Sequence, residues 1–435
     1  LIKYYLQYKR RKNISDEVFY ESFKEYFNKN VTDKEKLLIE IKNWSKAYSK
    51  ISERRFNSTQ LDYQLKRLSF LENTTYEPFL IAYIVEGEQL NEAVFTELVN
   101  IVETYLVRRF ICEIATNALN KVFLTLYSDV KKVVEKFGTS FSQALIAVLE
   151  KKQGSARFPK DDEFSTSLET REIYKLKTKS RAVLFDAIQQ KLTPESPDIL
   201  EKIVEKDYTI EHIMPQTLNS EWQQMLGENY KEIHDKLKHR LGNLTVTALN
   251  SELSNRKFSD KVAIIKTKGA LKINEFVTQQ TMWTEEEISK NQKRLSKILL
   301  SVFRFPVLEN RDILKEPDDN EVLVEHEKGK SYTNQKAIGY EFLEGYKERK
   351  NWIDIFIGIL QELSEYDSVI FNDFVESSKW FSNIPSDGAV EINLGTYLVR
   401  GISNWNKFSL IDRLMDLCNL QPEELKIKFK IKKEQ

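Results

Sequence analysis

Most of the first 200 residues share one pattern, in which apolar side chains recur three and four positions apart with few glycines or prolines between them. This spacing predicts amphipathic helices, because residues three and four apart share one face of an α-helix. Helices are predicted at 16–27 and, most clearly, at 91–113. The stripe of the second helix consists of Val94, Phe95, Leu98, Val102, Tyr105 and Leu106. We expect residues 1–200 to form a helical domain that acts as a scaffold.

Residues 207–261 depart from this pattern and hold three of the four histidines, His212, His234 and His239. Residues 208–213 favour a strand that ends in Glu211-His212, and the alternating, β-branched segment 243–247 favours a second strand. Further on, helical spacing returns in Leu253, Phe258, Val262 and Ile265. The predicted order is therefore strand, strand, helix.

These residue types suit phosphodiester hydrolysis, which needs an activated water and a cation on the phosphate oxygens. A neutral imidazole, that of His212, could accept the proton of the water. Glu211 and the amide oxygen of Asn250 are oxygen ligands suited to Mg²⁺ or Mn²⁺. Asn243 could brace the loop that orients His212. Taken alone, a Glu-His-x-x-Pro motif more often marks a structural histidine than a catalytic one.

Three motifs in combination are more specific than any of them alone. Ile-Glu-His-Ile-Met-Pro-Gln at 210–216 is followed by His-Arg-Leu-Gly-Asn-Leu-Thr at 239–245 and by Leu-Asn-Ser-Glu-Leu-Ser-Asn at 249–255. Together they resemble the C-terminal nuclease domain of GmrSD-type restriction proteins, whose core is similar to the ββα-metal fold of HNH nucleases. Glu211 stands where many HNH sites have aspartate.

The resemblance implies a mainly α chain, with a helical scaffold at 1–200, an HNH-like ββα-metal nuclease domain at 201–310 and a small α/β accessory domain. It implies a metal-dependent DNA endonuclease of a modification-dependent restriction or phage-defence system, acting on phage or modified DNA. The implied catalytic residues are His212 and Asn243, and the implied ligands of Mg²⁺ or Mn²⁺ are Glu211 and Asn250.

The resemblance extends into the helical block at 103–121 and 157–174. The first domain of the family is a ParB-like nucleotide-binding fold with an Asp-Gly-Gln-Gln-Arg signature, and this signature does not occur in the chain. We therefore expect a piece of a longer protein, with a nucleotide needed only by the missing domain. Arg108 and Arg109 could contact phosphate, although paired arginines in a long helix more often form intramolecular ion pairs.

The net charge is zero, with 66 basic and 66 acidic residues, so a global basic footprint for nucleic acid is missing. Residues 234–261 nevertheless carry six cations against three anions, and such a local excess can hold a DNA backbone. The candidate DNA contacts are His239, Lys236, Lys238, Arg240, Asn255 and Lys261. A solvated helix face is an equally good explanation for any single lysine.

Beyond a predicted linker at 311–335, residues 336–435 should form the accessory domain. Helices are predicted at 352–363 and 408–420, and strands at 397–403 and 425–431. In the last strand apolar residues alternate with Lys426, Lys428, Lys430 and Lys432. This row could touch DNA, but lysines that protect an edge strand explain it slightly better.

The remaining features point to an ordinary intracellular protein. Cys112 and Cys418 lie far apart in apolar contexts, which suits a reducing cytoplasm. We expect no membrane contact, and self-association is left open. The alternative function is a helical scaffold or DNA-binding regulator whose nuclease motif is inactive.

Overall fold

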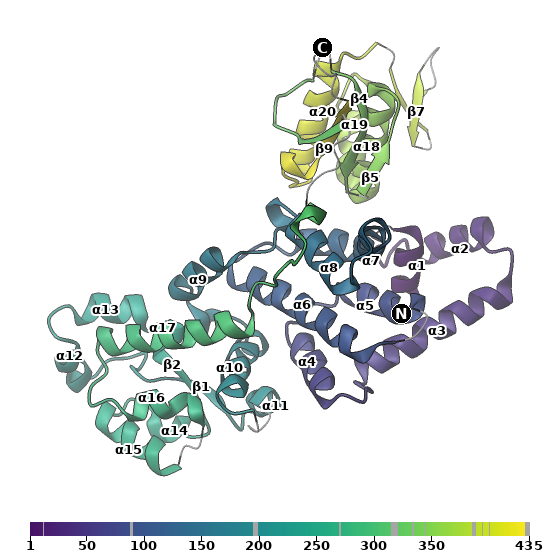
Figure 1. Cartoon of the computed structure of the whole chain (residues 1–435). Coiled ribbons are helices and arrows are strands. Elements are labelled where there is room, and N and C mark those ends of the chain that lie inside the picture. Colours follow the sequence, from purple (N-terminus) through teal and green to yellow (C-terminus); the bar gives the residue numbers. More distant parts are fainter. Residues whose placement is uncertain are drawn as a thin grey trace. The chain divides into compact units, whose positions relative to one another are not determined.

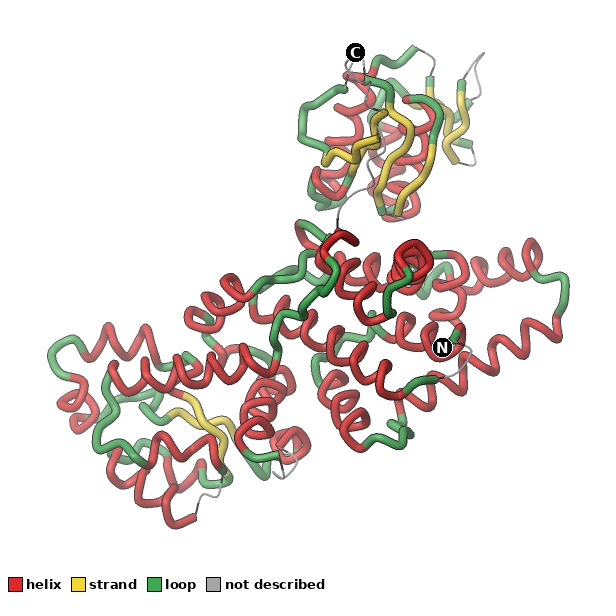
Figure 2. Tube along the Cα trace, in the orientation of Figure 1, coloured by secondary structure: helices red, strands yellow, loops and turns green. Residues whose placement is uncertain are grey.

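The computed structural model describes the chain except residues 12, 88–89, 195–198, 269–270, 315–320, 333–334, 344, 385–388, 394, 400 and 431–435, together with the side chains of 250, 312 and 321. It is mainly α, as the sequence predicts (Figures 1 and 2). The chain divides into two compact units, one of residues 1–8 and 14–311 and one of residues 9–13 and 312–435. The structure shows no helix long and apolar enough to span a membrane among the described residues.

Helices make up the chain up to residue 204. They are α1 (Ile2–Arg10), α2 (Phe19–Asn30), α3 (Lys34–Ser52), α4 (Thr59–Ser69), α5 (Glu77–Glu86), α6 (Glu92–Ile111), α7 (Asn117–Phe137), α8 (Phe141–Glu150), α9 (Asp161–Thr170), α10 (Thr178–Leu192) and α11 (Ile199–Val204), with single 3-10 turns η1 (Gly154–Ala156) and η2 (Ile173–Lys175). The helices predicted at 16–27 and 91–113 correspond to α2 and α6.

Buried charges tie α6 to its neighbours. Arg67 on α4 donates from Nε and Nη2 to the fully buried carboxylate of Glu103, at 2.5 and 2.7 Å. Arg108 is also fully buried and donates to Phe303 O at 2.7 Å and to Asp161 Oδ1 at 2.5 Å. Arg109 likewise donates to backbone carbonyls. The arginine pair therefore serves intramolecular contacts, the alternative that the sequence favoured over phosphate binding.

The second half of this unit is built around two short strands. Its elements are β1 (Thr209–His212), α12 (Ser220–Leu226), α13 (Tyr230–Leu237), η3 (Leu241–Asn243), β2 (Leu244–Thr247), α14 (Asn250–Leu253), α15 (Phe258–Lys268), η4 (Lys272–Asn274), α16 (Glu275–Thr278), α17 (Glu285–Val302) and η5 (Arg311–Leu314). The strands pair antiparallel, with Glu211 opposite Thr245 and His212 opposite Leu244. Figure 1 shows them between α17 and the group α14–α16.

The helix predicted after Leu249 is interrupted. It forms as two helices, α14 and α15, because the backbone at Ser254 adopts φ 32°, in the left-handed region. The helix α17 begins after Thr284. Its capping box is present, with Thr284 Oγ1 and N both donating to Glu287 Oε2 at 2.6 and 3.0 Å.

One hydrophobic core crosses the boundary predicted at residue 200. It contains Val107 of α6 and Phe185 of α10 from the helical block, Leu244 and Val246 of β2, and Leu299 of α17. The two strands are therefore packed against the helices that precede them, and the predicted domains 1–200 and 201–310 lie in a single compact unit.

The C-terminal unit contains two sheets. Strands β3 (Glu321–Glu325), β9 (Lys426–Lys430), β4 (Ala337–Phe342) and β5 (Gly345–Glu348) form one sheet in this order, and β6 (Phe381–Ser382), β8 (Thr396–Leu398) and β7 (Val390–Asn393) form the other. The helices are α18 (Trp352–Tyr366), α19 (Ser368–Glu376) and α20 (Asn404–Leu417), with a 3-10 turn η6 (Pro422–Glu424).

This unit corrects three sequence-based expectations. The predicted linker contains β3, which pairs with β9. Because β4 pairs with the other side of β9, the lysine-bearing strand lies inside its sheet and is not an edge strand. The strand predicted at 397–403 is confined to β8. Ile431 and Lys432 lie outside the described residues.

We expect Glu103→Ala to lower the free energy of unfolding by about 3–5 kcal/mol, because it leaves the charge of Arg67 buried without its main partner. The matched control is Glu163→Ala, which removes the half-exposed partner of Arg157 and should cost only about 0–1 kcal/mol. Urea unfolding of the full chain, followed by circular dichroism, measures both. Equal losses in the two variants would contradict the importance of the buried pair.

Candidate functional site

The site lies at the end of β1, where backbone bonds fix the chain after His212. Ile213 N donates to Asn243 O at 2.9 Å, which extends the β1–β2 ladder by one bond. His234 on α13 contacts the same segment through Nε2 and Pro215 O, 2.9 Å apart. The strand end and its turn are therefore held from both sides.

Asn243 is the main brace of this turn. Its fully buried amide accepts hydrogen bonds from Met214 N at 2.8 Å and Trp283 Nε1 at 3.0 Å. It donates to Met214 O at 2.9 Å and Lys238 O at 3.0 Å. These four bonds occupy both N–H groups and the carbonyl. The geometry agrees with the bracing role, and a direct catalytic role of Asn243 stays a prediction.

His212 faces a second imidazole, that of His239. His212 Nε2 and His239 Nδ1 are 3.2 Å apart. The ring of Tyr174 lies 4.1 Å from that of His212, centroid to centroid, and stacks on His239 at 5.5 Å with an interplanar angle of 10°. Tyr174 N also donates to His239 O at 3.2 Å. His239, predicted as a DNA contact, therefore belongs to a three-ring cluster around His212.

The pKa values of both imidazoles are lowered. Burial, followed by the positive neighbours His239, Lys261 and Arg181, lowers the pKa of His212 from 6.5 to about 3. Burial also lowers the pKa of His239. A neutral imidazole has a free nitrogen lone pair, but a pKa of about 3 makes His212 a weak base at neutral pH.

Lys261 and Glu211 form a buried pair beside His212. Lys261 Nζ lies 3.5 Å from Glu211 Oε1 and donates to His212 O at 2.9 Å. Burial lowers the pKa of Lys261 to about 8 and raises the pKa of Glu211, and both effects outweigh the attraction between the two charges. Lys261 was predicted to contact DNA from the surface. Its side chain is fully buried, so the structure contradicts that expectation.

The predicted metal ligands are only partly described. Glu211 supplies one carboxylate with about a tenth of its side chain exposed. Asn250 begins α14, but its side chain lies outside the described residues. Among the described residues, no group of three or more His, Cys, Asp or Glu is placed to hold a metal ion. One carboxylate suits a hard cation that keeps most of its water ligands.

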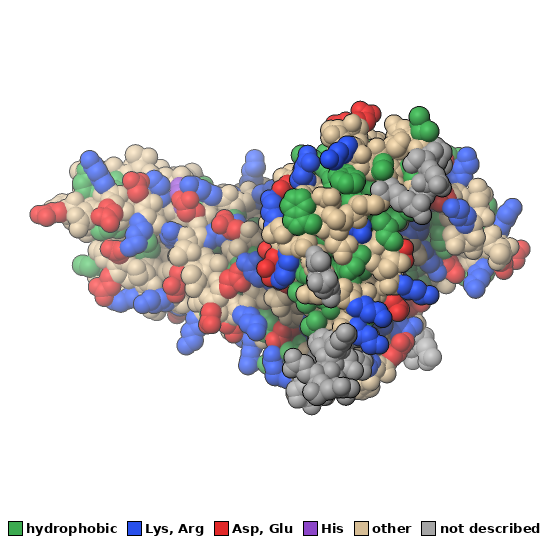
Figure 3. Space-filling model, turned by 90° about the horizontal axis from the view of Figure 1, so that it is seen from above, with side chains coloured by type: hydrophobic (Ala, Val, Ile, Leu, Met, Phe, Trp, Pro, Cys, Tyr) green, Lys and Arg blue, Asp and Glu red, His purple; other side chains and the backbone are tan. Residues whose placement is uncertain are grey.

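Of the predicted DNA-contacting cations, Lys236 is exposed on α13, whereas Lys238 and Arg240 follow this helix and are half-buried. Lys236 pairs with Glu285 at 3.0 Å and Lys238 pairs with Asp235 at 2.9 Å. Arg240 Nε donates to Lys236 O at 3.1 Å. Asn255 is exposed, and its carbonyl accepts from Asn219 Nδ2 at 2.9 Å. Basic and acidic side chains are similarly interspersed on the face drawn in Figure 3.

Sequence reasoning missed two groups of the site. Tyr174 stands in a segment that resembled the family, yet nothing local indicated that its ring would cover two histidines 38 and 65 residues away in sequence. Trp283 opens α17 and hydrogen-bonds Asn243. An aromatic residue at a helix start is usually a packing residue, so periodicity alone would not reveal this contact.

The fold and this site define a mainly helical protein with a histidine pair and a buried lysine–glutamate pair at the end of a two-stranded antiparallel sheet. The sequence model described as GmrSD restriction endonucleases, C-terminal domain, matches residues 158–298. The match confirms the resemblance over a segment that contains β1, β2, α14, α15 and most of α17. No curated protein matches the chain.

The lowered pKa of His212 predicts acid sensitivity in the metal-free chain. As the pH falls below about 6.5 the unfolded chain binds a proton at this position, whereas the folded chain does so only near pH 3. Stability is therefore lost from pH 6.5 downward, on the order of 2 kcal/mol by pH 5. The His212→Asn variant should lack this component. The urea midpoints of both proteins, recorded in EDTA at pH 7 and at pH 5, measure this loss of stability. An equal loss of stability in both proteins would contradict its assignment to His212.

Proposed function

We propose that the chain is a metal-dependent DNA endonuclease of the HNH type, and that it acts in a modification-dependent restriction or phage-defence system. The proposal is carried by one observation: at the end of β1 the His212 ring is buried against His239 and Tyr174, while Lys261 links the backbone carbonyl of His212 to the carboxylate of Glu211. The match of this segment to a restriction endonuclease family supports DNA as the substrate.

His212 is the general base in this proposal. It takes the proton of the attacking water, and its low pKa keeps it unprotonated at neutral pH. His239 faces the reactive nitrogen and holds the ring in place until a substrate enters. Tyr174 covers both rings on one side, which limits their motion and excludes solvent from that side.

Lys261 has two effects on the site. Its bond to His212 O fixes the backbone at the base, and its positive charge keeps a proton off the neighbouring imidazole. Glu211 is the proposed oxygen ligand of Mg²⁺ or Mn²⁺, with Asn250 as the second. When bound, the cation would act as a Lewis acid that stabilises charge on the phosphate oxygens.

His212→Ala should reduce DNA cleavage by roughly 10² to 10⁴-fold, because it removes the general base. The affinity for DNA in EDTA should remain near that of the wild-type chain, since the cations of the surface are unchanged. Nicking of supercoiled plasmid in Mn²⁺ and anisotropy of a labelled duplex provide the two measurements. Wild-type cleavage by the purified variant would exclude His212 as the base.

The absence of cleavage by the wild-type chain with either Mg²⁺ or Mn²⁺ would favour the alternative, a helical scaffold or DNA-binding regulator with an inactive nuclease motif. In that case DNA binding would persist without hydrolysis.

Glu211→Gln should raise the concentration of Mn²⁺ needed for half-maximal cleavage, because it removes the charge of the proposed ligand and preserves its shape. Asn250→Ala should act in the same direction. A titration of Mn²⁺ at fixed DNA measures the shift, with Glu252→Gln as a control that alters a carboxylate paired with Lys268 outside the site. An unchanged metal requirement in the Glu211 variant would remove it from the ligand set.

A further inference from the structure

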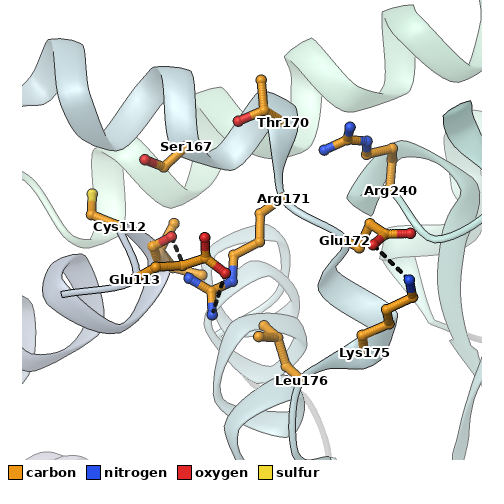
Figure 4. A pocket seen from close by; sticks show the side chains of 10 residues that line it. Cys112, Glu113, Ser167, Thr170, Arg171, Glu172, Lys175, Leu176 and Arg240 are labelled. Carbon is orange, nitrogen blue, oxygen red and sulfur yellow. Dashed lines mark hydrogen bonds and ion pairs between the residues drawn. The ribbon is translucent and has the colours of Figure 1, made fainter. Parts of the chain in front are cut away.

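A pocket of about 430 Å³ lies beside the histidine cluster, within the first compact unit. Its wall combines the end of α6, the last turn of α9 and η2 with Arg240, the residue that follows His239 (Figure 4). Two of its lining residues, Glu172 and Lys175, lie on either side of Tyr174 within two positions of it. The pocket residues therefore flank Tyr174, whose ring contacts His212 and His239. Its volume falls in the range of small-ligand sites, about 300–1,000 Å³.

The charges around the pocket leave one cation in excess. Glu172 pairs with Lys175 at 2.7 Å, and Glu113 pairs with Arg171 at 3.5 Å. Arg240 is the fifth charged lining residue, and within the described part of the chain no carboxylate forms an ion pair with it. Figure 4 shows its side chain directed toward the space between Thr170 and Arg171.

Two guanidinium nitrogens of the pocket residues lack acceptors. Arg171 Nε and Arg240 Nη1 are both shielded from solvent and make no hydrogen bond within the described chain. A buried donor without an acceptor is costly, on the order of 1–3 kcal/mol, and more for a charged group. These two nitrogens are shielded, so an anion in the pocket would meet other atoms of the guanidinium group of Arg240, and guanidinium groups are well suited to phosphate oxygens.

From these observations we propose that the pocket is a phosphate subsite for the nucleic-acid strand, which binds a phosphodiester group next to the one that is cleaved. The inference rests on the proposed function, since it identifies the ligand by its proximity to His212 and His239. Arg240 supplies the unbalanced charge, and Ser167 and Thr170 add polar side chains to the wall. Residues of the helical block would therefore take part in binding the substrate.

The test uses the full chain in EDTA, so that binding is measured without cleavage. Anisotropy of a labelled DNA duplex is recorded between about 50 and 200 mM salt for Lys175→Gln/Arg240→Gln. The matched control is Lys131→Gln/Lys132→Gln, which removes two exposed cations of α7 outside the pocket. The pocket variant should bind about tenfold more weakly, and its salt slope should fall by one to two units, about 0.9 for each lost phosphate contact. The control should remain close to wild type.

A second variant, Thr170→Glu, adds a negative charge to the rim and removes no cation. It should weaken binding to a similar extent, and circular dichroism confirms that the variants are folded. Inorganic phosphate and a mononucleotide are tested as competitors. If neither competitor displaces the duplex at millimolar concentrations, and the pocket variants bind the duplex more weakly, the ligand of the pocket is a phosphate of the DNA strand. Displacement of the duplex by inorganic phosphate alone would show a site for free phosphate and overturn the strand assignment.

The inference would be overturned if the pocket variants had the same affinity for DNA and the same salt slope as the Lys131/Lys132 control. Cleavage assays of the same proteins separate this outcome from failure of the proposed function. If the wild-type chain does not cleave DNA and the pocket variants still bind it more weakly, the endonuclease proposal is refuted, and the pocket remains a phosphate-binding site for DNA with no relation to a cleaved bond. Normal cleavage and binding in those variants would refute only the subsite.

Discussion

The Gln292 side chain joins the two halves of the first unit. Its Oε1 accepts from Gly242 N at 2.7 Å, and its Nε2 donates to Leu168 O at 3.0 Å. One amide on α17 thus connects η3, which leads into β2, with α9 of the helical block. Gly242 allows this approach because a Cβ at that position would collide with Ile288 O. The register of β2, the position of Asn243 and the turn after His212 all depend on this contact.

The elements that could be predicted from sequence are those whose signals are local. The strands β1 and β2, the helix α6 and the capping box at Thr284 follow from periodicity and short-range hydrogen bonds. The pairing of β9 could not be predicted, since its partners β3 and β4 lie about a hundred residues earlier. Alternation indicates one buried face, but it does not say how many strands flank it.

The roles of the site residues show the same limit. His212 and Glu211 were identified because residue type and spacing carry their chemistry. Lys261 was assigned to the surface because a lysine near other cations in sequence is normally solvated. Tertiary packing around α15 placed it in the interior beside Glu211 instead. The bonds of Asn243 likewise come from residues 5 to 40 positions away in sequence, so their number could not be predicted from the local pattern.

The core shared by α6, α10, β2 and α17 has a consequence for how such a chain can be divided and recombined. A cut near residue 200 would leave Leu244, Val246 and Leu299 without the helices that cover them. The strand pair therefore cannot be moved to another protein by itself. A chimaera that contains it would also need the apolar faces of α6 and α10. Sequence changes in the helical block and in the strand pair are consequently constrained together, through side-chain volume as much as through chemistry.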